Sequence, residues 1–207
     1  MIYKKLINYA LSRHFLTHSS IKIENALSEQ EIQLVEKMLE EKPITQSLIG
    51  MGDGEKNLEI RSSKVFFINY SKENSWLFEK INLVVEKINE EYYNYDLNGY
   101  DFLQYSEYSA EEIGHYDHHI DMSFDAIPQK DYDYMCRKLS FSIALNDQEK
   151  DYMGGDFEIK TGVEAIPIKL NRGDLLFFPS FILHRVTPVT KGIRKSLVGW
   201  VLGPKFK

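Results

Sequence analysis

The chain has 207 residues and a mass of 24.2 kDa, and its 43% apolar and 27% charged content is ordinary for one globular domain with a substantial core. Its formal net charge of −6 excludes the sequence-wide basic field that binds nucleic acid without specificity. The single cysteine, Cys136, cannot form an internal disulfide, and no apolar run reaches the roughly 18–20 residues that span a membrane, so we expect a reducing, cytoplasmic location.

The first segment, residues 1–15, is basic and amphipathic. Lys4, Lys5 and Arg13 interrupt its apolar residues, and no small-residue cleavage site follows. We therefore expect a helix or an extended arm packed on the domain, in preference to a targeting signal.

Two helices are expected in the first half of the chain. Ser28 followed by Glu31 is a capping-box pattern, and the apolar residues after it recur at helical spacing until Pro43. A single apolar stripe predicts a second helix over residues 74–93. Between them, residues 46–57 contain three glycines, which predicts a flexible surface loop. A plain connector and a lid over a pocket are both compatible with this loop.

From about residue 101 onward the apolar periodicity changes toward two, which indicates strands. Helices that precede a block of short strands favour a mainly β, α+β fold: a double-stranded β-helix, or jelly roll, with N-terminal helices packed on one face. We expect a single domain over residues 1–207, with a helical support region (1–100) and a jelly-roll core (101–204). The expected strands are residues 102–108, 114–121, 139–146, 156–160, 175–178, 183–186 and 195–202.

Three residues of this strand-rich half form a candidate metal site. His119 and Asp121 are separated by one residue, so an extended strand presents both side chains on the same face, and His184 would come from a distant strand. Two imidazoles and one carboxylate that leave other coordination positions open are typical of non-haem Fe(II) oxygenases. His115 and Asp117 repeat the same spacing, and spacing alone leaves both pairs open.

Several segments resemble a known family. Residues 172–179 read RGDLLFFP, residues 183–189 read LHRVTPV, and residues 192–194 read GIR. Together with GHYDHHID at residues 114–121, they resemble the Fe(II)- and 2-oxoglutarate-dependent dioxygenases, in the prolyl 4-hydroxylase-like branch that includes the PKHD-type hydroxylases. The resemblance extends over residues 105–200. A tyrosine stands three positions before the first metal-binding histidine of that family, and this feature selects the pair His119 and Asp121.

The resemblance also implies roles for individual residues. His119, Asp121 and His184 would bind Fe(II), and Arg194 would bind the distal carboxylate of 2-oxoglutarate, because a guanidinium matches a carboxylate in charge and geometry. Tyr116 would contact the co-substrate or the substrate. The family positions near the substrate pocket and its rim are occupied here by Trp200, Arg137 and Tyr108.

The activity that this resemblance implies is the hydroxylation of an unactivated C–H bond, with consumption of O₂ and release of succinate and CO₂. A prolyl residue of a peptide or protein is the expected target, and ascorbate is an expected accessory reductant. Asp121 favours hydroxylation over halogenation, because related halogenases carry a small residue at this position. The alternatives are a free amino acid hydroxylase, a nucleic-acid demethylase of the same superfamily, and a non-catalytic metal-binding or oxygen-sensing interaction domain. The chain lacks basic stretches interleaved with aromatic residues, which disfavours nucleic acid as a partner.

Overall fold

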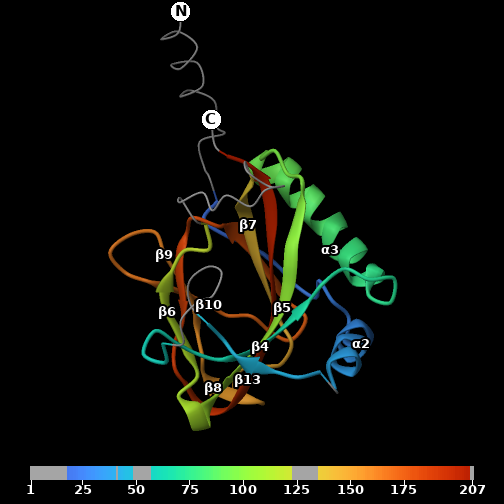
Figure 1. Cartoon of the computed structure of the whole chain (residues 1–207). Coiled ribbons are helices and arrows are strands. Elements are labelled where there is room, and N and C mark those ends of the chain that lie inside the picture. Colours follow the sequence, from blue (N-terminus) through green and yellow to red (C-terminus); the bar gives the residue numbers. More distant parts are fainter. Residues whose placement is uncertain (1–17, 41, 49–56, 123–134, 206–207) are drawn as a thin grey trace, which may run out of the picture.

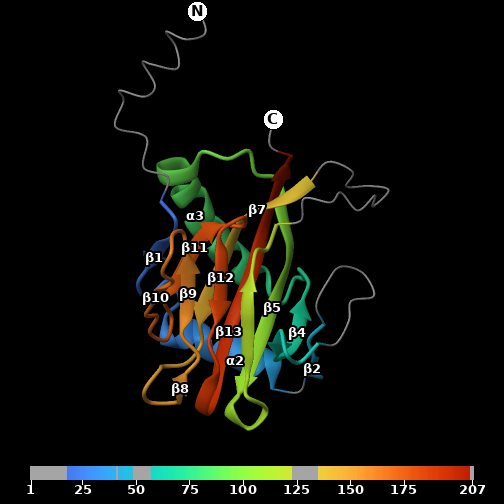
Figure 2. The same cartoon turned by 90° about the vertical axis from the view of Figure 1, so that its left-hand side faces the viewer.

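The computed structural model describes residues 18–40, 42–48, 57–122 and 135–205. Two antiparallel β-sheets face one another, and two helices cover the outer face of the larger sheet (Figure 1). A view turned by 90° shows strands of the smaller sheet in front of the larger one, with the helices behind (Figure 2). This arrangement is the jelly roll with helices on one face that the sequence predicts.

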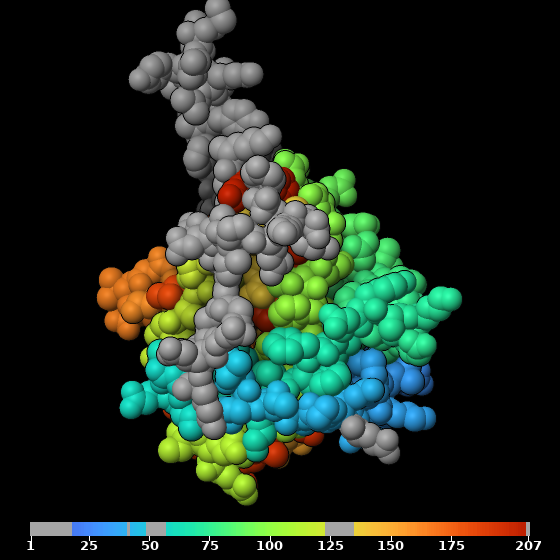
Figure 3. All heavy atoms as spheres, in the orientation of Figure 1, coloured from blue at the N-terminus to red at the C-terminus, as the bar shows by residue number. Residues whose placement is uncertain are grey.

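The larger sheet has eight strands. Their order is β1 (Ile21–Ile23), β11 (Leu175–Pro179), β7 (Met135–Ala144), β13 (Val189–Pro204), β5 (Gly99–Ser109), β4 (Lys64–Ile68) and β2 (Thr45–Gln46), with β8 (Tyr152–Gly154) paired to β13. The smaller sheet has the order β10 (Ile166–Ile168), β9 (Phe157–Lys160), β12 (Leu183–Val186), β6 (His115–His119) and β3 (Arg61–Ser62). The turn between β9 and β10, orange in Figure 3, projects on the side of the molecule opposite α3.

Helix α2 (Glu29–Leu39) begins at the predicted capping box. The backbone N–H of Ser28 donates to Glu31 Oε2 at 2.8 Å, and the backbone N–H of Glu31 donates to Ser28 Oγ at 3.3 Å. These two bonds satisfy amide groups that have no partner within the helix.

Helix α3 (Ser75–Ile88) continues as a π-helical turn (Asn89–Tyr93), so the predicted helix over residues 74–93 is present. It ends at Asn94, whose φ of 51° is left-handed. Within the described part of the chain, neither helix combines the length and the apolar content that crossing a bilayer requires.

One apolar core lies between the helices and the larger sheet, and a second lies between the sheets. In the first core, helix residues such as Val35, Leu77 and Ile81 pack with strand residues such as Phe141 and Phe177. Removing this apolar surface from water fixes the helices on the sheet. The second core is formed by Tyr108, Ala144, Tyr152, Phe157, Ile159, Leu170, Leu176, Phe178, Val186 and Val189.

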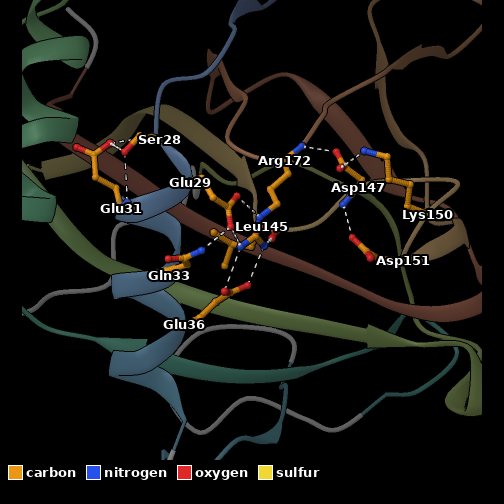
Figure 4. A network of polar contacts seen from close by, with 10 residues as sticks. All are labelled: Ser28, Glu29, Glu31, Gln33, Glu36, Leu145, Asp147, Lys150, Asp151 and Arg172. Atoms are coloured by element: carbon orange, nitrogen blue, oxygen red, sulfur yellow. Dashed lines mark hydrogen bonds and ion pairs between the residues drawn. The ribbon is translucent and has the colours of Figure 1, made fainter.

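Arg172 ties α2 to the loop before β11 (Figure 4). Its Nε donates to Glu29 Oε2 at 2.9 Å, and its Nη1 donates to Glu36 Oε1 at 2.8 Å and also to the carbonyl of Leu145. The two carboxylates raise the pKa of Arg172 above its ordinary value, Glu36 more than Glu29. The backbone N–H of Arg172 donates to Asp147 Oδ1 at 2.8 Å, so one residue links the helix to two loops of the jelly roll.

The region before residue 101 contributes more than the helical support that the sequence predicts. It supplies β1 and β4 to the larger sheet and β3 to the smaller one. These strands are only two to five residues long, which is too short for periodicity to reveal. The predicted N-terminal helix or arm at residues 1–15 lies outside the described residues, as does most of the predicted glycine-containing loop (49–56).

Candidate active site

His119 and His184 lie directly opposite one another on paired strands. His119 ends β6, His184 is the second residue of β12, and the antiparallel register pairs the two residues. Their ring centroids are 4.1 Å apart. His119 and His184 are 65 residues apart in the sequence, and strand pairing brings them together. Side chains directly opposite one another on paired strands have Cβ atoms about 4.5–5.5 Å apart.

Asp121 lies just beyond the end of β6 and completes the cluster. Its backbone N–H and that of Met122 both donate to the carbonyl of Ser180, at 2.9 and 3.0 Å, which turns the chain so that the carboxylate faces the histidines. One carboxylate oxygen lies 3.7 Å from His119 Nε2, and the other lies 3.6 Å from His184 Nε2. The three candidate ligand atoms all lie within 4.8 Å of one another.

The hydrogen bonds of the two imidazoles fix which nitrogen carries the proton. Nδ1 of His119 lies 2.8 Å from the carbonyl oxygen of Asp117, and Nδ1 of His184 lies 2.9 Å from that of Ile182. A carbonyl only accepts, so each Nδ1 donates its hydrogen. In the neutral rings both Nε2 lone pairs then point at the centre of the cluster, which is how metal-binding histidines are usually oriented.

The charge states also suit a cation. Burial, followed by the neighbouring His184, lowers the pKa of His119 to about 3, so this ring is neutral at pH 7. Burial opposes the ionisation of Asp121, but His184, His119, a hydrogen bond with Ser140 and the charge of Arg137 together hold the pKa of Asp121 below its ordinary value. A buried carboxylate that lies beside the Nε2 atoms of two imidazoles fits a divalent metal ion.

His115 and Asp117, the competing pair, stand outside this cluster. The ring of His115 contacts two backbone carbonyls, of Ile113 at 2.7 Å and of Glu59 at 3.0 Å, and the carboxylate of Asp117 is exposed. The register between β6 and β12 shifts between His184↔His119 and Val186↔Tyr116, so β6 contains an extra residue. This bulge ends the strict alternation that would put all four residues on one face.

Arg194 and Trp200 line the same cavity of about 410 Å³ as the three candidate ligands. Alternate residues of β13, namely Arg194, Ser196, Val198 and Trp200, all face this cavity, as period two predicts. Arg194 is 4% exposed, and its Nη1 donates to Ser196 Oγ at 3.1 Å. The volume lies within the usual range of about 300–1,000 Å³ for small-molecule sites.

The two tyrosines named from the sequence both line this cavity. Tyr108, predicted near the rim of the substrate pocket, is buried, and the Cζ of Arg194 lies 5.4 Å from its ring centroid. Tyr116 stacks on His119 with centroids 3.5 Å apart. On paired strands, Tyr116 also lies opposite Arg61, whose Cζ is 4.5 Å from its ring centroid.

Arg137 lies in the cavity wall beside Trp200. Its Cζ stands 4.0 Å from the Trp200 ring centroid, and its Nη2 donates to Asp101 Oδ2 at 2.8 Å. Phe102 packs edge-to-face on Trp200 with centroids 5.4 Å apart. Phe102 and Trp200 form an aromatic wall, which would bury an apolar part of a ligand with little loss of rotamer freedom.

The sequence analysis did not identify two residues of this region, Arg61 in the cavity wall and Tyr152 beside Arg194. Arg61 lines the cavity from β3, and Tyr152 packs in the core beside Arg194. β3 has only two residues and therefore no periodicity. The one available signal is an arginine separated by Ser62, Ser63 and Lys64 from the apolar run that begins at Val65.

The comparison with known sequences agrees with these observations. Residues 103–202 match the 2OG-Fe(II) oxygenase superfamily. A PKHD-type hydroxylase from Synechococcus sp. (strain CC9311) is 43% identical over 92 residues, which cover 44% of this chain and 38% of that relative. The matched part of the chain thus spans well under half of the curated relative's length.

Two solved structures share the fold over nearly the whole chain. A prolyl-4-hydroxylase from Pseudomonas putida has a TM-score of 0.68 at 16% identity and covers 100% of both chains. A prolyl hydroxylase from Trichoplax adhaerens, in complex with a hypoxia inducible factor peptide fragment, has a TM-score of 0.71 at 19% identity over 98% of this chain and 94% of that one. The sequence match over residues 103–202, just under half of the chain, and the similarity to the PKHD-type hydroxylases support a 2OG-Fe(II) oxygenase of PKHD type.

Proposed function

We propose that this protein is an Fe(II)- and 2-oxoglutarate-dependent dioxygenase that hydroxylates an unactivated C–H bond. The observation that carries the proposal is the cluster of His119, Asp121 and His184, with both Nε2 lone pairs and an ionised carboxylate facing one centre. The donor set is the one that non-haem Fe(II) oxygenases use. Because these three residues provide only part of an octahedral shell, the remaining positions would stay open to small ligands.

Arg194 would hold the distal carboxylate of 2-oxoglutarate. Its guanidinium is buried in the same cavity, so pairing with a carboxylate would be strong, and Ser196 fixes its direction. Tyr108, which lies against Arg194, is the better placed tyrosine for contacting this end of the co-substrate. Tyr116 would instead hold the ring of His119 by stacking.

When bound, iron and 2-oxoglutarate supply the oxidising chemistry: one atom of O₂ enters the substrate as a hydroxyl group, and the other enters succinate as CO₂ leaves. The chain's own residues bind and orient. The aromatic wall of Phe102 and Trp200 would position the C–H bond, and the buried surroundings of His184 would keep bulk water away from the reacting atoms.

A prolyl residue is our proposed target. The proposal is supported by the prolyl hydroxylases among the structural neighbours and by the aromatic wall, which suits a compact saturated ring. We further propose a peptide or protein partner, ascorbate as an accessory reductant and a cytoplasmic setting, the last because the lone Cys136 cannot form an internal disulfide.

An anaerobic titration with Fe(II) and then 2-oxoglutarate tests the proposal. A visible charge-transfer band that requires both components is the expected result, and its absence would contradict the proposed co-substrate. Under air, succinate should form in proportion to a mass gain of one oxygen on a proline-containing peptide. A band without succinate release would favour a binding or sensing role, and demethylation of an oligonucleotide would point to a different substrate class.

A further inference from the structure

Arg61 is a buried guanidinium in the wall of the cavity that the proposed reaction does not use. It is 9% exposed and lies on β3, the edge strand of the smaller sheet, opposite Tyr116. Its Nε donates to Ser63 Oγ at 2.9 Å, and its flat face covers the Tyr116 ring at 4.5 Å. The stem and one face of this side chain are therefore held in place.

The charge of Arg61 has no acidic partner among the described residues. Arg137 pairs with Asp101 at 2.8 Å and Arg185 pairs with Glu158 at 2.6 Å, but no described carboxylate lies within 4.0 Å of the Arg61 side-chain nitrogens. Its two terminal nitrogens likewise have no hydrogen-bond acceptor in this part of the chain. A buried, unpaired guanidinium is costly, whereas one that meets a carboxylate forms strong charge-assisted bonds.

A charge count within the cavity isolates Arg61 further. Arg61, Arg137 and Arg194 line the cavity, and Asp121 is its one acidic residue among those described. Under the proposed function, Asp121 and the 2-oxo acid end of the co-substrate neutralise the iron, and the distal carboxylate neutralises Arg194. Arg137 already has Asp101. Among the arginines of the cavity wall, Arg61 is the one left without an anion from the described residues or the co-substrate.

We infer that Arg61 recognises a carboxylate of the substrate. Arg61 covers Tyr116, and Tyr116 stacks on His119 at 3.5 Å, so the guanidinium is one aromatic layer away from a proposed iron ligand. Arg61, Tyr116 and His119 all line one cavity, so a carboxylate bound at Arg61 would belong to the substrate that occupies this cavity. The substrate class is therefore a compound that carries an acidic group as well as its reactive C–H bond, and its apolar remainder would contact Phe102 and Trp200.

This inference rests on the proposed function and narrows it. A guanidinium near a reacting prolyl group could meet the α-carboxylate of a chain end or the side chain of an adjacent acidic residue. Both sources present the same planar anion. An internal peptide that offers Arg61 nothing but neutral carbonyl groups would leave most of the available binding energy unused, because bonds to charged acceptors are about twice as strong.

Two matched pairs of peptides test the inference, with binding measured by calorimetry on the protein loaded anaerobically with Fe(II) and 2-oxoglutarate. The first pair is a short peptide that ends in proline, as the free acid and as the C-terminal amide. The second pair carries an internal proline next to glutamate or next to glutamine. We expect one acid to bind about 10–100-fold more tightly than its neutral partner, and the pair that shows this difference identifies the source of the carboxylate.

Substitutions at Arg61 then assign the effect. Arg61→Gln should remove the preference for the acid, and Arg61→Lys should retain part of it. Arg185→Gln, a change outside the cavity at a residue whose partner is Glu158, should leave the preference unchanged. The charge-transfer band and the thermal midpoint of Arg61→Gln, measured alongside, show that the variant is folded and still binds the co-substrate. Equal binding within both pairs, no binding of either acid, or a preference that persists in Arg61→Gln would overturn the inference. Failure of the wild-type protein to form the band would instead overturn the proposed function.

Discussion

Gly155 lies against the side chain of Arg194. A β-carbon added at Gly155 would lie 3.1 Å from Arg194 Cδ and 2.9 Å from Val189 Cγ2, and the φ of Gly155 is +64°. Both the conformation and the close approach require a residue without a side chain. The turn after β8 is thus part of the wall that holds the Arg194 stem in the cavity.

Gly155→Ala should therefore act on co-substrate binding as well as on stability. We expect the free energy of unfolding to fall by about 1–3 kcal/mol and the dissociation constant for 2-oxoglutarate to rise, because Arg194 must shift. Gly162→Ala is the matched control, since a β-carbon there meets nothing within 4 Å. Urea unfolding and anaerobic 2-oxoglutarate titration of both variants measure the two effects. A rise in the dissociation constant for Gly162→Ala as well would argue against this explanation.

Replacing Arg194 itself should have a larger effect on co-substrate affinity. Arg194→Ala removes the buried guanidinium that would pair with the distal carboxylate, so we expect the 2-oxoglutarate requirement to rise about 100-fold or more. Arg194→Lys keeps the positive charge but loses the planar pair of donors. Its 2-oxoglutarate requirement should lie between those of the wild-type protein and Arg194→Ala. The concentration of 2-oxoglutarate at half-maximal charge-transfer absorbance is the measurement. An unchanged value in Arg194→Ala would remove this residue from the proposed site.

The proposed iron ligands can be separated from the competing pair by single substitutions. His184→Ala and Asp121→Ala should each weaken Fe(II) binding by more than about 100-fold, because changes to groups that only support a metal ligand already cost about 10–100-fold. His115→Ala should leave Fe(II) binding intact, since its ring nitrogens contact the backbone carbonyls of Ile113 and Glu59 and lie outside the candidate ligand cluster. Equal losses in His115→Ala and His184→Ala would show that the wrong pair had been chosen.

The capping box of α2 should make part of the stability depend on pH. The hydrogen bond from the Ser28 backbone is the main cause that holds the pKa of Glu31 below its ordinary value of 4.5. A carboxyl group with a lowered folded-state pKa contributes stability above the unfolded-state pKa, and this contribution is lost as pH falls through the folded-state value. Glu31→Gln should therefore cost about 1 kcal/mol at pH 7 and much less near pH 3.

Urea unfolding at the two pH values measures this difference, and Glu79→Gln on α3 is the control. Glu79 is exposed, so its replacement should change the free energy of unfolding by less than about 0.5 kcal/mol at either pH. A cost for Glu31→Gln that does not change between pH 7 and pH 3 would contradict the role of the ionised carboxylate.

The sequence predicts the local features of this fold well, because local chemistry determines them. The capping box at Ser28 and Glu31 needs only four consecutive residues, and the predicted strand over residues 183–186 has the observed bounds. The alternation along β13 likewise places Arg194 and Trp200 in one cavity. In each case the pattern and the structure depend on the same short stretch of chain.

Features that depend on non-local pairing were not predictable in the same way. The extra residue in β6 exists only relative to β12, so the sequence alone placed His115, Asp117, His119 and Asp121 on one strand face. Arg61 reaches the cavity because the two-residue strand β3 pairs with β6, and nothing within β3 indicates that pairing. Tyr108 follows the same rule: its place beside Arg194 results from the register between β5 and β13.

The stack of Arg61, Tyr116 and His119 spans two paired strands, and its spacings are set by ring contact rather than by flexible side chains. Because this stack fixes the distance between the guanidinium of Arg61, which would bind the acidic group, and the proposed iron site, it would determine which carbon of the substrate is hydroxylated. If one methylene is added between the acidic group and the ring of the substrate, the hydroxyl group should then be added to a different carbon. That carbon would be the one that lies at the original distance from Arg61.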